Sequence, residues 1–176
     1  MADVYAFFGT LLALGIAFPG MLAGAWLLFP DVVGRARARA VGTPWRSFFL
    51  GIGAILLLAV PVMVLSAIPS GITKGIAVLL VFLAFGVATL GAASIAAEMG
   101  DRLRGLGSSS LSPAGAFVRG AVALELAAVF PIVGWFLVIP GVLLLGFGAG
   151  VAGLLRWLPR PSRLVAPAGE TVLGGA

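Results

Sequence analysis

Glu125 is the residue whose type and position best suit it for chemistry inside an apolar segment. It is the only charged residue between positions 120 and 155. A charge is costly in such surroundings, so Glu125 is a candidate proton carrier, ion ligand or partner of a buried base. The alternative is a structural role, in which Glu125 lies shallowly, is protonated, or hydrogen-bonds the hydroxyl of Ser94 or Thr89. The sequence supplies no second buried charge with which Glu125 can form a relay.

Other catalytic groups are scarce. The chain contains no histidine and no cysteine, which removes thiol nucleophiles, imidazole bases and the usual ligands of haem, iron–sulfur clusters, zinc and copper. Glu98 and Asp101 are three residues apart, without sign of the cleft that acid–base catalysis requires. The sequence also lacks a phosphate-binding loop and a dinucleotide-binding motif. We therefore predict a protein that is not an enzyme and that holds no metal and no cofactor.

Arginines are concentrated in the polar segment 31–46. Alternate residues do not share one face of a helix, so this segment is predicted to be a loop that faces solvent or lipid headgroups. Its arginines are candidate contacts for anionic headgroups; they are Arg35, Arg37, Arg39 and Arg46. The net charge of +5 does not indicate nucleic acid, because the arginines flank hydrophobic segments.

The composition indicates a membrane protein. Of the 176 residues, 61% are apolar and 10% are charged, with a mean hydropathy of +1.21, whereas a soluble domain has about 25% charged residues. Backbone groups in lipid must be hydrogen-bonded internally, and the apolar segments lack the alternation of barrel strands, so they should be helices. We predict an all-α integral membrane protein with one domain, 1–157, and a flexible cytoplasmic tail, 158–176.

Five transmembrane helices are predicted from the lengths of the apolar segments. Between Arg119 and Arg156 the apolar segment is nearly twice the ~20 residues that one crossing needs, so it should form two helices that turn near Gly134 and Trp135. The remaining spans are expected at 4–29, 47–68 and 72–97. Spans two to five then form two hairpins.

The distribution of basic residues predicts the orientation. With five spans, every arginine falls on one side of the membrane, and Lys74 alone falls on the other. By the positive-inside rule the N-terminus is outside and the C-terminus is cytoplasmic. The richness in alanine, glycine and arginine is typical of a bacterial protein, which would place the chain in the cytoplasmic (inner) membrane.

Pairs of glycines four residues apart are candidate helix-packing positions. Such pairs allow two helices to approach closely in a membrane, and they occur at Gly20 with Gly24 and at Gly146 with Gly150. The sequence leaves open whether Gly146 and Gly150 face another helix of this chain or a partner.

Three short motifs give a resemblance to a known group of proteins. They are the segment Thr43–Gly51 leading to Pro61, the segment Phe130–Trp135, and the segment Gly146–Gly150. Over about residues 43–155 the chain resembles the hydrophobic membrane region attached to some bactofilin-like, polymer-forming proteins. The resemblance implies a small helical membrane module that anchors or organises another component. This chain lacks a β-helical repeat, so filament formation is not implied.

These observations lead to three hypotheses. The first is a non-catalytic accessory or scaffold subunit of a larger membrane complex, with anionic lipids and other membrane subunits as partners. The second is a small transporter or channel with Glu125 near the pathway, favoured by Pro61 and Pro131 at equivalent depths of two similar hairpins. The third is the anchor for a cytoskeletal or envelope partner that the resemblance implies.

Overall fold

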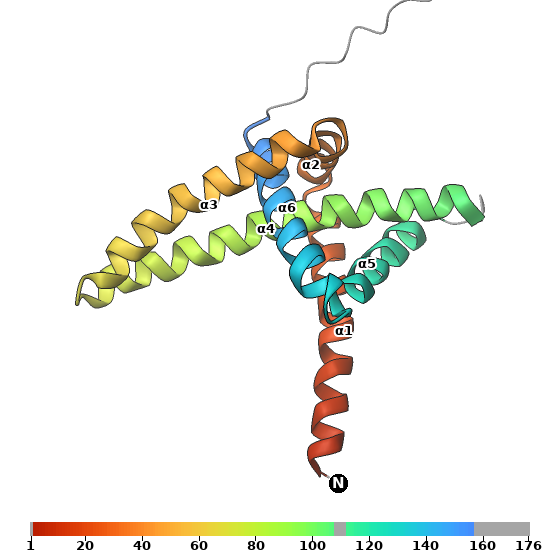
Figure 1. The fold of residues 1–176 in the computed structure, drawn as a ribbon, viewed down its shortest axis with the longest axis horizontal. Coiled ribbons are helices and arrows are strands. Elements are labelled where there is room, and N and C mark those ends of the chain that lie inside the picture. Colours follow the sequence, from red (N-terminus) through yellow and green to blue (C-terminus); the bar gives the residue numbers. More distant parts are fainter. Residues whose placement is uncertain (1, 108–111, 157–176) are drawn as a thin grey trace, which may run out of the picture.

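The computed structural model describes residues 2–107 and 112–156, and over these ranges the chain is helical without any strand. This confirms the all-helical prediction. The elements are α1 (Ala2–Leu28), α2 (Pro30–Gly42), α3 (Pro44–Ala67), α4 (Gly71–Gly107), α5 (Pro113–Val129), the short π-helix η1 (Gly134–Val138) and α6 (Ile139–Leu154) (Figure 1). The predicted tail 158–176, with Arg160 and Arg163, lies outside the described residues.

Helix α6 lies at the centre of the molecule and is crossed by α2, α3 and α4 (Figure 1). Four of its glycines allow these crossings because each of the four faces the backbone of a neighbour; they are Gly146, Gly148, Gly150 and Gly153. A Cβ added at Gly148 would overlap the carbonyl of Ser47 in α3, and one added at Gly153 would lie 2.9 Å from the carbonyl oxygen of Val32 in α2. The glycine-rich sequence of α6 therefore sets the closeness of the three crossings. We call this region the centre.

Helices α4 and α5 make a second close contact through small residues. A Cβ added at Gly100 of α4 would overlap the carbonyl of Ala116, and one added at Gly120 of α5 would overlap the carbonyl of Ala96. Close backbone approach of this kind increases van der Waals contact between helices that lipid alone does not drive together.

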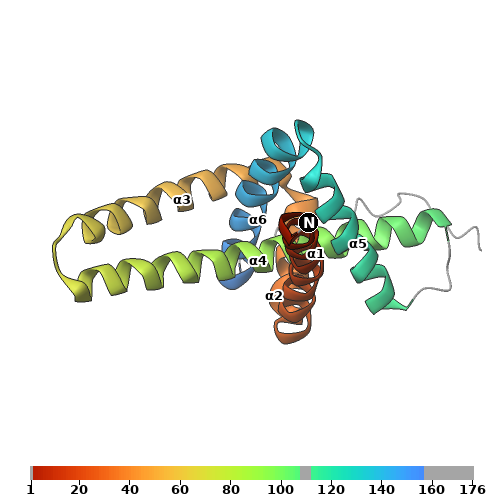
Figure 2. The same ribbon diagram turned by 90° about the horizontal axis from the view of Figure 1, so that it is seen from below.

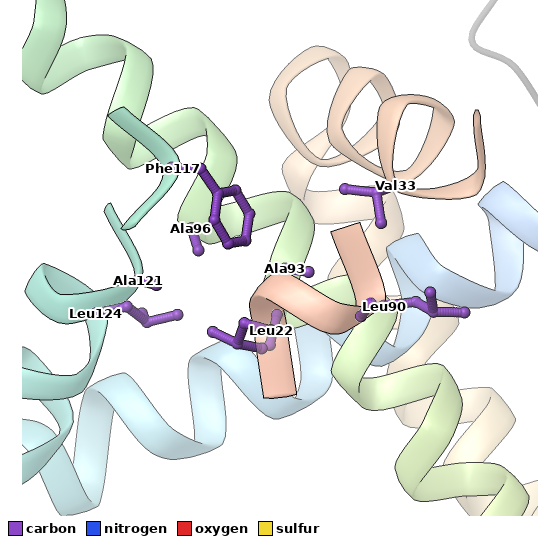
Figure 3. Close-up of a cluster of buried hydrophobic side chains, with 10 residues drawn as sticks. Leu22, Val33, Leu90, Ala93, Ala96, Phe117, Ala121 and Leu124 are labelled. Atoms are coloured by element: carbon purple, nitrogen blue, oxygen red, sulfur yellow. The ribbon is translucent and has the colours of Figure 1, made fainter. Parts of the chain in front are cut away.

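An apolar cluster fills the space between α1, α2, α4 and α5 (Figure 3). Leu22 of α1 is fully buried there, and Phe117 and Leu124 of α5 are 3% exposed. The ring of Trp26 stacks on that of Phe117 with centroids 4.9 Å apart. The cluster joins the C-terminal half of α1 to the rest of the fold.

The opposite part of the molecule is a projecting pair of helices that we call the arm, residues 53–67 of α3 and 71–86 of α4 (Figures 1 and 2). Ala77 is the only buried residue in these two ranges. Large apolar side chains such as Leu57, Met63 and Phe82 are more than two-thirds exposed. The arm thus presents an apolar surface that the chain itself does not cover.

The predicted loop at 31–46 is wrong, because residues 30–42 form helix α2. Pro30 favours the start of α2, because proline is preferred at the first position of a helix. Asp31 in the first turn stabilises the same end through the helix dipole. The break at Phe29 bends the chain by 106° between α1 and α2. The alternating arginines hid the narrow apolar side of α2, where Val33 and Ala36 are buried.

Within residues 2–107 and 112–156, three helices are long and apolar enough to cross a membrane: Pro44–Ala67, Gly71–Leu106 and Gly134–Leu154. The bent pair Gly15–Leu28 and Pro30–Gly42 would make a fourth if it counts as one span. These helices support a multi-pass membrane protein. Helix α1 runs across the direction of α4 rather than alongside it (Figures 1 and 2), so the described chain is not a bundle of parallel helices.

The two predicted hairpins differ from each other in the structure. Helices α3 and α4 turn back at Ile68–Ser70, and α3 continues through Pro61 without a break. Pro131 instead follows the end of α5, in the turn that leads to η1. From that turn α5 and α6 diverge, and both pack on α4 (Figure 1). The expected equivalence of Pro61 and Pro131 is therefore wrong.

Candidate functional site

The arginines of α2 point to different neighbours. Alternate residues of a helix are about 200° apart around its axis, so Arg35 and Arg37 leave α2 on different sides. Arg35 donates a hydrogen bond from Nε to the carbonyl oxygen of Gly153 in α6, at 2.9 Å. Arg37 reaches α4 instead. The alternation that suggested a loop thus attaches one helix to two others.

Arg37 is the cation at the middle of an ion-pair network. Its Nη2 lies 2.8 Å from Oε2 of Glu98, and its Nη1 lies 2.5 Å from Oδ2 of Asp101. Glu98 also accepts a hydrogen bond from Nε of Arg102, at 2.7 Å. Two carboxylates and two guanidinium groups neutralise one another, so Arg37 is engaged by the protein itself rather than left open to a phosphate group.

Arg39 and Arg46 have different surroundings. The Nε atom of Arg39 is buried and has no hydrogen-bond partner within the described part of the chain. Arg46 is exposed, and no described acidic residue lies within ion-pair distance of it. Of the four candidate lipid contacts, Arg35 and Arg37 therefore have protein partners, whereas Arg39 and Arg46 retain free donors. Headgroup binding stays a prediction for these two residues.

Glu125 lines an apolar groove of about 620 Å³. Side chains from five elements form its walls: Phe18 and Met21 of α1, Thr89 of α4, Glu125 of α5, Trp135 of η1 and Val142 of α6. The carboxylate is half-buried, and one of its oxygens would lie 3.5 Å from a Cβ added at Gly15 of α1. Glu125 is therefore at a meeting point of helices that are far apart in the sequence.

The hydroxyl partners expected for Glu125 are bonded elsewhere. Ser94 donates to the carbonyl oxygen of Gly91 at 2.6 Å, and Thr89 donates to that of Phe85 at 2.8 Å. Both bonds return to α4 itself, as is common for serine and threonine in helices. The expectation that Ser94 or Thr89 hydrogen-bonds Glu125 is therefore wrong.

The four candidate packing glycines divide into two pairs. Gly146 and Gly150 lie against Gly91 and Val87 of α4, so their contacts are within this chain. A Cβ added at Gly20 or Gly24 would meet no atom within 4 Å of the described structure. The packing of α1 uses Leu22 and Ala25 instead.

Sequence reasoning missed several residues that organise these regions. It did not pair Glu98 and Asp101 with Arg37, because Arg37 is more than 60 positions away in the sequence. It expected Trp135 at the turn between two spans, and the structure adds that Trp135 lines the groove with Glu125. The one available signal was the turn at Gly134, which brings η1 back against α5, since a Cβ there would overlap the carbonyl of Ala128.

The described residues contain no group of three acidic side chains placed to hold a metal ion. Comparison with known proteins gives no assignment either. The sequence matches no protein-family model, no curated protein and no solved structure.

Proposed function

We propose that this protein is a non-catalytic accessory or scaffold subunit of a larger membrane complex, and that the arm is the part that contacts a partner. The observation that carries the proposal is the unequal use of small residues. Four glycines of α6 in the centre lie against neighbouring backbones, whereas Gly53, Gly75 and Gly86 in the arm have open space around them. In membranes, small residues are where a second helix packs closely.

The arm also leaves room between its own helices. A hollow of about 430 Å³ lies between α3 and α4, lined mostly by apolar residues that include Val62, Val78 and Phe82. Two helices that need no further partner pack against each other along their length, to the density of a protein interior. A partner's apolar helix on the arm would bury this surface, and it would explain why two long helices project together.

The proposal includes the five-span topology, with the N-terminus outside and the C-terminus in the bacterial cytoplasm. Its support is the positive-inside distribution, which places every arginine on one side and Lys74 on the other. Helix α5 has 17 residues, which is at the short end of the range of about 17–25 for a membrane helix. In this arrangement Arg39 and Arg46 contact anionic headgroups on the cytoplasmic side.

The absence of cysteine makes the topology directly testable. Single substitutions Asp3→Cys and Ser70→Cys should react with an impermeant maleimide in intact cells, whereas Ser112→Cys should react only after the cells are opened. Reaction of Ser112→Cys in intact cells would contradict the proposed orientation.

The partner is tested by site-specific photocrosslinking in the native cell. A benzoylphenylalanine at Phe82 of the arm should give one discrete adduct with a membrane protein that also co-purifies in a fixed ratio. Val118 on α5 serves as the control, because it is also apolar and exposed, at 49%, but lies away from the arm. A filament-forming partner would support the anchor role that the resemblance implies. Adducts with lipid alone at Phe82 would contradict the subunit role.

A further inference from the structure

The groove that contains Glu125 is a chemically simple site. Its lining consists of apolar side chains with the single hydroxyl of Thr89 and the single carboxyl group of Glu125. Its volume, about 620 Å³, lies within the range of about 300–1,000 Å³ that is typical of small-molecule sites. One wall is η1, and short π-helical segments occur frequently at functional sites. The groove therefore has the size of a ligand site, a mostly apolar lining and one ionisable group.

Glu125 has no ion-pair partner among the described residues. The nearest cation on its own helix is Arg119, six residues away, which corresponds to roughly 9 Å along the axis and to a different side of the helix. Among the described residues, no lysine or arginine lines the groove. A carboxylate in apolar surroundings gains most from a positive charge that is brought by a ligand.

We propose that this groove binds a lipophilic organic cation, with its charge beside Glu125 and its apolar groups against α1, α4, α5, η1 and α6. A bare metal ion does not fit, because Mg²⁺ and Ca²⁺ take six or more oxygen ligands, whereas one carboxyl group and one hydroxyl line the groove. A cation with its charge spread over apolar substituents loses little hydration and fills the volume. The proposal is independent of the subunit role.

The test uses equilibrium binding of radiolabelled tetraphenylphosphonium to the full chain in nanodiscs of phosphatidylcholine, a lipid without net charge. The native protein should bind one equivalent saturably. Glu125→Gln should weaken binding by about tenfold or more, the range expected for loss of a charged partner. Asp31→Asn removes the same charge from an exposed position on α2 and should leave binding unchanged.

A second variant tests the groove without changing charge. Ala88 lines the groove, so Ala88→Phe should fill part of it and weaken binding to a similar extent. Equal affinity for native protein, Glu125→Gln and Ala88→Phe would overturn the proposal, because the cation would then partition into lipid only.

The native protein provides a measurement that does not depend on any variant folding. A hydrophobic carbodiimide should modify Glu125, as detected by mass spectrometry, and saturating tetraphenylphosphonium should suppress this modification. Modification that is unaffected by the cation would overturn the proposal. Protection that an equal concentration of uncharged triphenylphosphine oxide reproduces would show a groove that selects for apolar shape and not for charge, and would also overturn it.

Discussion

The centre and the arm are built from the same kinds of residues but make opposite use of them. Gly51 and Gly53 are two positions apart in α3. A Cβ added at Gly51 would overlap the carbonyl of Leu144 in α6, whereas a Cβ added at Gly53 would meet no atom within 4 Å. The same helix therefore passes from a tight backbone contact in the centre to an uncovered surface in the arm.

This difference shows where the tertiary fold gets its stability. Lipid tails are as apolar as leucine side chains, so burial of apolar surface does not by itself hold membrane helices together. Close backbone approach increases dispersion contacts, and these add up over many atoms. The centre has such contacts on several sides of α6, whereas the arm has few. We therefore expect stability to depend on the centre and to tolerate change in the arm.

The largest effect is expected for Gly148→Leu, which would break the centre. The new side chain has to displace the backbone of Ser47 and Gly51, so we expect a loss of about 3 kcal/mol or more. Size-exclusion profiles and thermal unfolding in mild detergent measure this. Gly141→Leu is the control, because it lies in the same helix and an added Cβ there meets no atom within 4 Å. Equal stability of the two variants would contradict the glycine-packed centre.

A smaller but sharper comparison uses Gly51→Ala and Gly53→Ala. Alanine at Gly51 should destabilise the fold by about 1–3 kcal/mol, because a methyl group has no room beside Leu144. Alanine at Gly53 should stabilise the helix by about 0.5–1 kcal/mol, because it restricts the unfolded chain and fits the helix. Unfolding titrations of both variants in one detergent test the prediction. If the two substitutions shift stability in the same direction, the boundary between centre and arm is misplaced.

The smallest effect is expected for Arg37→Ala, which removes a side-chain link at the edge of the centre. Arg37 is one-third exposed and its partners are 22% and 46% exposed, so each pair contributes roughly 0–1 kcal/mol. The melting temperature should fall slightly at low salt, and the difference should shrink at high salt because exposed charges are screened. Arg46→Ala is the matched control, an exposed arginine outside the network. A loss that is independent of salt would show that packing of the arginine stem, not its charge, joins α2 to α4.

The sequence predicted well those features that depend on neighbouring residues. Hydropathy over ~20 positions was enough to identify the apolar helices of α3, α4 and α6. Proline and glycine located the turn before Gly71 and the turn at Gly134. It failed at α2, because the apolar side of this short helix is narrow, with Val33 and Ala36 buried, and the alternating arginines dominate its sequence. The sequence also predicted helix packing equally for Gly20 with Gly24 and for Gly146 with Gly150. The spacing of two glycines is the same whether or not another helix lies against them.

The amino-acid sequence by itself determined that this is a helical protein suited to a membrane, because composition and local periodicity decide whether a segment is stable in lipid. Only the tertiary structure decided which glycines support a helix crossing and which carboxylates have a cation. Glu98 and Glu125 are the same residue type in apolar helices. Glu98 forms an ion pair with Arg37 of α2, whereas Glu125 lines a groove in which no described residue is basic. Whether each carboxylate has a cationic partner depends on helices that are distant in the chain, so no local sequence pattern predicts it.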